Sequence, residues 1–211
     1  MGHTSMSTLA VLALLILTRV AEAKPVLLNV VRVENEHYGT ELAEQAVNRA
    51  VRSIRKEVGV KVIIKSWVEM GEYCDSRGDG LTTQERLDRL FCYRSLGVFD
   101  IADPILFLVP PITNASGWFL AGYASSQCYK RDRRPTAYAA VEESNDKGED
   151  RRRHSIVVIK HELAHLLGAT HDNNGRNIMH PDPLPMVGGE ENRALKFSKR
   201  TIEEIKGCIQ K

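Results

Sequence analysis

The stretch HELAHLLGATHD, residues 161–172, decides how the whole chain is interpreted. His161 and His165 are four residues apart, so a helix of about 3.6 residues per turn places both imidazoles on one face. Gly168 allows the chain to leave that helix in a backbone conformation that other residues resist. His171 then returns as a third nitrogen ligand, and three ligands leave the fourth position of a tetrahedral zinc ion open. An open position is typical of a catalytic zinc site, whereas structural sites are closed.

Glu162 lies beside the histidines, where it can reach a metal-bound water without being a ligand. The five-residue pattern HExxH occurs by chance often enough that it does not establish a zinc site by itself. Gly168 and His171 extend it to HExxHxxGxxH, the spacing used by the metzincin clan of zinc endopeptidases. The longer motif therefore predicts a catalytic zinc site with Glu162 as the general base.

A second element, NIMHP at residues 177–181, follows the zinc motif. Met179 resembles the methionine of the clan's Met-turn, which packs beneath the metal ligands. Taken alone, Met179 would be an ordinary core methionine, but the two elements in this order favour the metzincin interpretation. His180 follows Met179, and we do not expect it to bind the metal because the motif already supplies three ligands.

Asp172, directly after the third histidine, makes the chain resemble the reprolysin (adamalysin) branch of the metzincins, and antarease-type venom metalloproteinases in particular. The resemblance covers most of the sequence and implies a secreted single-domain protease that needs one zinc ion. We expect Asp172 to steady the turn by hydrogen bonding rather than to bind zinc or calcium. A calcium ion, bound by many relatives, is an open alternative, but no acidic ligand on the first predicted strand matches theirs.

The chain contains four cysteines, Cys74, Cys92, Cys128 and Cys208. An even number in an oxidising compartment suggests two disulfides, for which three pairings exist. Cys128 ends the segment GYASSQC, which resembles the family segment along the upper rim of the cleft, and Cys208 resembles the partner cysteine of the family's C-terminal helix. The resemblance therefore implies the pair Cys128–Cys208, which leaves Cys74–Cys92.

Residues 9–17 form an apolar run that is too short to span a bilayer, and it leads to the small-residue cleavage pattern Ala21-Glu22-Ala23. We therefore predict a signal peptide over residues 1–23 and one catalytic domain over residues 24–211. No lysine or arginine precedes that run, although signal peptides usually carry one there, but a core helix starting at residue 9 is the poorer alternative. No other stretch is long and apolar enough for a membrane anchor, so we expect a secreted protein.

The formal net charge of +2 over 211 residues argues against a nucleic-acid or anionic-membrane partner. We expect a monomer whose partners are protein or peptide substrates. Asn114 begins an N-glycosylation sequon, Asn-Ala-Ser, in a predicted surface turn.

The hydrophobic periodicity predicts an α/β domain, a mixed and twisted sheet of about five strands with helices packed on it. Residues 155–159 have strand-like composition, but a strand would place His161 and His165 too far apart to share a metal easily. The predicted strands are 26–33, 60–68, 105–109, 117–124 and 136–141. The predicted helices are 42–58, 82–96, a zinc-site helix at about 154–167, and a C-terminal helix that carries Ile202, Ile205 and Ile209.

These features predict metal-assisted peptide-bond hydrolysis by a secreted endopeptidase, such as a venom or saliva component. Substrate would extend along residues 118–121 as an added strand, and the family resemblance implies that residues 181–187 wall the specificity pocket. One alternative is a catalytically silent secreted binding protein on a metzincin scaffold, which would have no chemical need of Glu162. Another is a matrixin-like or astacin-like protease, against which Asp172 and the C-terminal cysteine helix argue.

Overall fold

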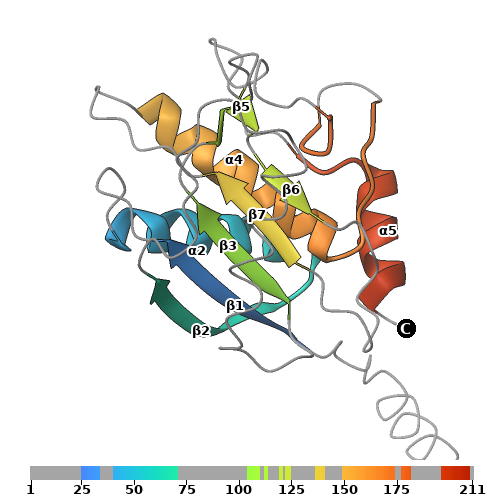
Figure 1. The fold of residues 1–211 in the computed structure, drawn as a ribbon. Coiled ribbons are helices and arrows are strands. Elements are labelled where there is room, and N and C mark those ends of the chain that lie inside the picture. Colours follow the sequence, from blue (N-terminus) through green and yellow to red (C-terminus); the bar gives the residue numbers. More distant parts are fainter. Residues whose placement is uncertain are drawn as a thin grey trace, which may run out of the picture.

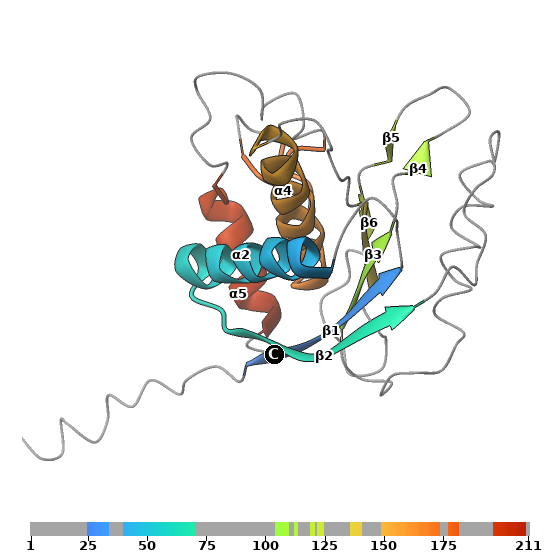
Figure 2. The same ribbon diagram turned by 90° about the vertical axis from the view of Figure 1, so that its left-hand side faces the viewer.

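The fold has two layers, with the helices on one face of a mixed sheet (Figure 2). The mixed α/β class predicted from the sequence is therefore confirmed. The computed structural model describes residues 25–33, 40–70, 104–109, 112–113, 119–120, 122–124, 136–140, 149–173, 177–181 and 196–209 (Figure 1).

Within the described residues, five strands form the main sheet in the order β2-β1-β3-β7-β6. Two shorter strands, β4 (Ile112–Thr113) and β5 (Phe119–Leu120), pair with each other in a second small sheet. The parallel strands of the main sheet are β1 (Val26–Val33), β2 (Val62–Met70), β3 (Ile105–Val109) and β7 (Thr136–Ala140), and β6 (Gly122–Ala124) runs antiparallel to β7.

Strand β1 lies between β2 and β3 and is buried on both faces of the sheet. Val30 and Val31 point to opposite faces because side chains alternate along a strand, and neither side chain is exposed. A strand buried on both faces is a continuous apolar run rather than an alternating one. This burial explains why residues 26–33 could be recognised as a strand from composition alone.

Helix α2 (Thr40–Val58) covers the sheet with an apolar stripe. Ala43, Val47, Ala50 and Ile54 recur at helical spacing, and all four are fully buried. The helix ends at Gly59, whose φ of +82° is in the left-handed region and whose N–H donates to the Arg55 carbonyl at 3.0 Å.

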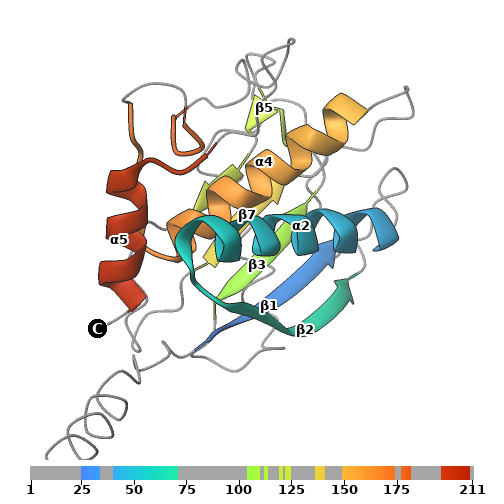
Figure 3. The ribbon, with the colours of Figure 1, turned by 180° about the vertical axis from the view of Figure 1, so that it is seen from behind.

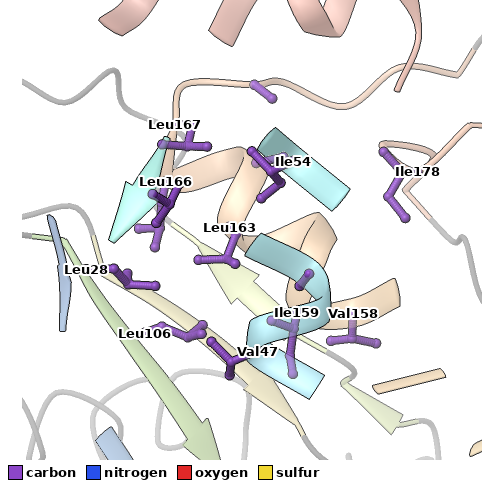
Figure 4. Close-up of a cluster of buried hydrophobic side chains, with 14 of the residues drawn as sticks. Leu28, Val47, Ile54, Leu106, Val158, Ile159, Leu163, Leu166, Leu167 and Ile178 are labelled. Atoms are coloured by element: carbon purple, nitrogen blue, oxygen red, sulfur yellow. The ribbon is translucent and has the colours of Figure 1, made fainter. Parts of the chain in front are cut away.

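Helix α4 (Glu149–Leu166) packs against α2 and against strands β6 and β7. Ser155, Val158 and Ile159 are buried in this helix, although residues 155–159 have strand-like composition. Intrinsic propensity is worth only tenths of a kcal/mol per residue, so burial between α2 and the sheet outweighs it. The core that joins the two layers includes Leu28, Leu106, Val47, Ile54, Ile159 and Leu163 (Figure 4).

Helix α5 (Lys199–Ile209) lies beside the C-terminal end of α4 (Figures 1 and 3). Ser198 caps its first turn, because the Ser198 hydroxyl accepts the N–H of Thr201 at 3.2 Å. Thr201, Ile205 and Cys208 are the buried residues of the helix, at the spacing of a single face.

Most of the predicted elements are observed with small shifts. The strand predicted at 60–68 begins and ends two residues later as β2, and the zinc-site helix begins at Glu149 instead of about 154. The single strand predicted over 117–124 was wrong, because β5 and β6 belong to different sheets. The helix predicted at 82–96 and the signal peptide lie outside the described residues. Among the described residues, no helix is long and apolar enough to cross a membrane.

Candidate metal centre

Helix α4 places His161 and His165 on one face, as their spacing requires. Both side chains are buried, with 5% of their surface exposed, and their Nε2 atoms are 3.0 Å apart. The rings meet edge to face, with centroids 4.7 Å apart. Two ring nitrogens of successive helical turns therefore point at one location.

Gly168 ends α4 and turns the chain back toward that location. The N–H of Ala169 donates to the Ala164 carbonyl and the N–H of Gly168 to the His165 carbonyl, both at 2.9 Å. This pair of hydrogen bonds is a Schellman motif, in which the residue at the Gly168 position takes a left-handed conformation. The φ of Gly168 is +97°, which a residue with a Cβ adopts only with strain.

His171 follows three residues later and completes the cluster. Its Nε2 atom is 3.3 Å from that of His161, and the ligand atoms of the three histidines all lie within 4.8 Å of one another. His171 is the exposed member of the cluster, and His161 and His165 are buried. The structure therefore brings together all three histidines of the motif in a position to bind a metal ion.

The hydrogen bonds on the far side of two rings determine which nitrogen faces the cluster. His161 Nδ1 lies 2.7 Å from the Ile178 carbonyl, and His165 Nδ1 lies 2.8 Å from the Ala169 carbonyl. A carbonyl oxygen only accepts, so each Nδ1 donates and carries the ring proton of a neutral imidazole. Each Nε2 then directs a lone pair at the cluster, as a metal ligand must.

The donor set fits a zinc ion. Nitrogens bound tetrahedrally at about 2.05 Å from zinc would lie about 3.3 Å apart. The two distances from His161 Nε2, 3.0 Å to His165 Nε2 and 3.3 Å to His171 Nε2, are close to that separation. Two unprotonated nitrogens this close repel each other unless a cation lies between them, and three neutral imidazoles are a common zinc ligand set.

The electrostatics of the cluster keep the imidazoles neutral. Burial, together with the neighbouring His165 and His171, lowers the pKa of His161 to about 3, although the hydrogen bond to Ile178 acts in the opposite direction. Burial lowers the pKa of His165 as well. Burial and the nearby His180 lower the pKa of His171. Neutral imidazole is the form that binds a metal, so the site does not depend on losing protons at neutral pH.

Glu162 follows His161 in α4 and is buried, with 4% of its surface exposed. Its Oε2 atom has no hydrogen-bond partner among the described residues. Removal from water raises the pKa of Glu162 to about 8. A cation held nearby by the histidines would favour the charged form, so the orphaned oxygen is a second observation that fits a metal at this location.

The segment around Met179 is hydrogen-bonded to His161 and to Asp172, the residue after His171. Met179 is fully buried in the core, and its carbonyl accepts the N–H of Asp172 at 2.9 Å. Asn177 closes the turn, because its Oδ1 accepts the Met179 N–H at 2.7 Å and its Nδ2 donates to the Asp172 carbonyl at 3.0 Å. The Ile178 carbonyl holds His161, so this one turn connects the first ligand with the residue after the third.

Asp172 takes part in hydrogen bonds, and the metal cluster found among the described residues consists of the three histidines. Its side chain is buried, and its Oδ2 accepts the Ser198 hydroxyl at 2.6 Å. His180 is likewise not part of the cluster formed by the described residues.

Comparison with solved structures finds the same fold in metallopeptidases. The archaemetzincin of Methanopyrus kandleri matches with a TM-score of 0.60 and 18% identity, over 91% of this chain and 99% of that one. Metalloproteinase-II from Bacteroides fragilis also has a TM-score of 0.60, with 16% identity over 92% of this chain and 55% of that one. The chain thus spans about half of the Bacteroides protein. No protein-family model and no curated protein sequence matches the chain.

The chain has a metallopeptidase fold. Both structures are similar over nearly all of this chain, so the fold is the one that the zinc motif predicted. The finer assignment to the reprolysin branch stays a prediction.

One supporting group was not recognised from the sequence. Lys160 precedes the first ligand and is buried, and its Nζ lies 2.6 Å from Glu57 Oε1 on α2. The other carboxylate oxygen of Glu57 accepts the Phe197 N–H at 3.0 Å, and the Lys160 ammonium lies 4.6 Å from the centre of the Phe197 ring. A lysine inside the apolar run SIVVIK was the available signal, but its partner is 103 residues away.

Several predicted sites lie outside the described residues. These are the glycosylation site Asn114, three of the cysteines (Cys74, Cys92 and Cys128), and most of the proposed substrate-binding segments at 118–121 and 181–187. Cys208 is buried in α5. Both predicted disulfide pairings therefore stay predictions.

Proposed function

We propose that the protein is a zinc-dependent endopeptidase. The observation that carries the proposal is the convergence of three histidine nitrogens beside a buried carboxyl group with an unpaired oxygen. The fold shared with two solved metallopeptidases supports it. Histidine clusters on other folds serve many purposes, but this combination matches what peptide hydrolysis needs.

His161, His165 and His171 would hold the ion, with the Ile178 and Ala169 carbonyls orienting the first two rings. When bound, zinc supplies Lewis acidity, which polarises a carbonyl oxygen and lowers the pKa of water toward about 7. The three histidines are neutral, so they leave most of the positive charge on the ion for this purpose.

Glu162 provides the proton transfer. Its carboxylate takes a proton from the attacking water and passes it to the nitrogen of the leaving amine. Oε2 has no competing partner among the described residues, so it is available for this exchange. Burial raises the pKa of Glu162 to about 8, and a cation held by the histidines would favour the charged form, so the group could both accept and return a proton.

We further propose that the protein belongs to the reprolysin branch and is secreted after removal of residues 1–23, as a monomer that acts in a venom or in saliva. Asp172 and the Cys208 helix support the branch, and the N-terminal apolar run supports secretion. Disulfides Cys128–Cys208 and Cys74–Cys92 go with this proposal. An N-terminal sequence of the secreted protein that does not begin at Lys24 would contradict the cleavage site.

The test compares the wild type with Glu162→Gln, which keeps the shape of the side chain but cannot take up a proton. We expect both proteins to bind one zinc ion per chain, measured by mass spectrometry of the metal content. Cleavage of a peptide library should fall by about 10²- to 10⁴-fold in the variant, the usual contribution of a general base. Glu44→Gln, an exposed glutamate on α2, is the matched control and should cleave like the wild type.

Two results would count against the proposal. A zinc-loaded wild type that cleaves no peptide would favour a binding protein on a protease scaffold. A Glu162→Gln variant as active as the wild type would show that another group takes the proton.

A further inference from the structure

The segment that carries the third histidine is held by contacts with helix α5. Thr170 directly precedes His171, and its N–H donates to Glu204 Oε2 at 2.9 Å. The Thr170 hydroxyl donates to the same carboxylate, 3.0 Å from both of its oxygens. Thr170 is exposed, so burial does not hold it in place and these hydrogen bonds have to do so.

Arg200 completes the contact from one turn earlier on α5. Its Nε lies 2.9 Å from Glu204 Oε1, and its Nη2 donates to the Thr170 hydroxyl at 3.1 Å. An exposed arginine–glutamate pair usually contributes little by itself. Here the arginine also fixes the direction of the carboxylate that receives a backbone N–H, and hydrogen bonds to charged groups are the stronger ones.

Thr170 lies between two groups on which the metal centre depends. On one side the Ala169 carbonyl holds the ring of His165, and on the other side His171 is itself a ligand. A shift of Thr170 would therefore move His171 together with the Ala169 carbonyl, which is the hydrogen-bond partner of His165. Asp172, on the far side of His171, is also tied to the start of α5 by Ser198.

We propose that Glu204, oriented by Arg200, is a positioning residue for the metal centre and acts through Thr170 on His171 and His165. The inference rests on the proposed function, because it takes the three histidines to be zinc ligands. It assigns to α5 a role in metal affinity in addition to the burial of its apolar side chains in the hydrophobic core.

The experiment measures the zinc dissociation constant of the full chain by competition with a chromophoric chelator. We expect Glu204→Ala to weaken zinc binding about tenfold, at the low end of the range for groups that orient metal ligands. Glu203→Ala is the matched control, because Glu203 is the exposed neighbouring glutamate on the same helix. It should bind zinc within about twofold of the wild type.

The melting temperature of the metal-free variants separates positioning from a merely structural role. We expect metal-free Glu204→Ala and Glu203→Ala to melt alike, since the contact with Thr170 is at the surface. Glu204→Gln keeps one oxygen that can accept the Thr170 N–H, so its zinc affinity should be intermediate. If Glu204→Ala does not fold, Glu204→Gln compared with Glu203→Gln decides the question by the same measurement.

Unchanged zinc affinity in Glu204→Ala, or an equal loss in Glu203→Ala, would overturn the inference, and would leave the proposed function intact if the wild type still binds zinc and cleaves peptides. A wild type that binds no zinc would overturn the proposed function and this inference with it.

Discussion

The two halves of the metal centre are held in place by different means. His161 and His165 lie on adjacent turns of α4, are buried, and each rests on a backbone carbonyl. His171 is exposed and lies outside any helix or strand. Thr170, the residue before it, is hydrogen-bonded to Glu204 of α5, and Asp172, the residue after it, is hydrogen-bonded to Ser198, which caps that helix.

This difference shows that the helical histidines and the exposed histidine need different interactions to offset the conformational entropy lost when their side chains are ordered. The helical pair shares one backbone geometry, so the core that stabilises α4 also orders both imidazoles. The third ligand needs separate hydrogen bonds, because an exposed side chain on irregular backbone keeps much of its conformational freedom. His161 and His165 are therefore ordered by the packing of α4 and form what we call the preformed half. His171 forms the other half, which is ordered by separate hydrogen bonds.

The largest expected effect comes from removing a ligand from either half. His165→Ala should weaken zinc binding by far more than about 100-fold, beyond the range for groups that only orient a ligand. His171→Ala should cost less, because binding pays more entropy to order an exposed side chain. Chelator competition measures both, with His180→Ala as the control that should stay close to the wild type. An equal loss for His180→Ala and His171→Ala would contradict the assignment of the third ligand.

A second prediction concerns Glu57, which supports both halves. It holds Lys160 beside the first ligand and Phe197 in the segment that leads to α5. Glu57→Ala should lower the free energy of unfolding by about 3 kcal/mol, because it removes the carboxylate from a buried ammonium group. Urea denaturation of the metal-free protein measures this loss. Glu44→Ala, exposed on the same helix, should change it by less than about 0.5 kcal/mol.

The loss of stability caused by replacing Glu57 should also depend on pH. Burial raises the pKa of Glu57, but hydrogen bonds from Lys160, Ser53 and Phe197 outweigh it, so the pKa lies below its usual 4.5. A carboxyl group with a lowered pKa in the folded state contributes fully above about pH 4.5, and the contribution is lost as the pH falls through the folded pKa. The stability difference between the wild type and Glu57→Gln should therefore shrink below about pH 4.5. A difference that stays constant down to pH 2 would show that the charge of Glu57 is irrelevant.

The smallest expected effect compares two glycines with similar backbone conformations. Gly59 ends α2 with a φ of +82°, and Gly168 ends α4 with a φ of +97°. Alanine at either position should cost about 1 kcal/mol of stability through backbone strain. Zinc affinity should fall only for Gly168→Ala, because that turn places the Ala169 carbonyl against His165. Equal zinc affinities for the two variants would show that the end of α4 does not position the ligands.

The preformed half of the site could be predicted from sequence because its information is local. The spacing of His161 and His165 has meaning only on a helix, and that requirement correctly outweighed the strand-like composition of residues 155–159. The buried strands β1 and β3 were recognisable for a related reason, since most of their buried side chains are apolar. The strand predicted over 117–124 failed because composition does not specify which strand a short segment pairs with.

The long-range contacts that support the two halves could not be predicted in this way. Glu57 and Lys160 are 103 residues apart, and Thr170 and Glu204 are 34 apart. A glutamate on the surface of an amphipathic helix has the same local pattern whether or not it meets a distant partner.

The sequence by itself determined which residues form the candidate metal centre: three histidines and a glutamate at a spacing that one helix and one glycine turn bring together. Only the tertiary structure decided which contacts hold these residues in place. The Ile178 carbonyl behind His161, the buried Lys160–Glu57 pair, and the carboxylate of Glu204 at Thr170 all join segments distant in the chain. Local spacing is set by backbone geometry, whereas these contacts exist only after helices and sheet have packed, because packing is what brings distant polar groups within hydrogen-bonding reach.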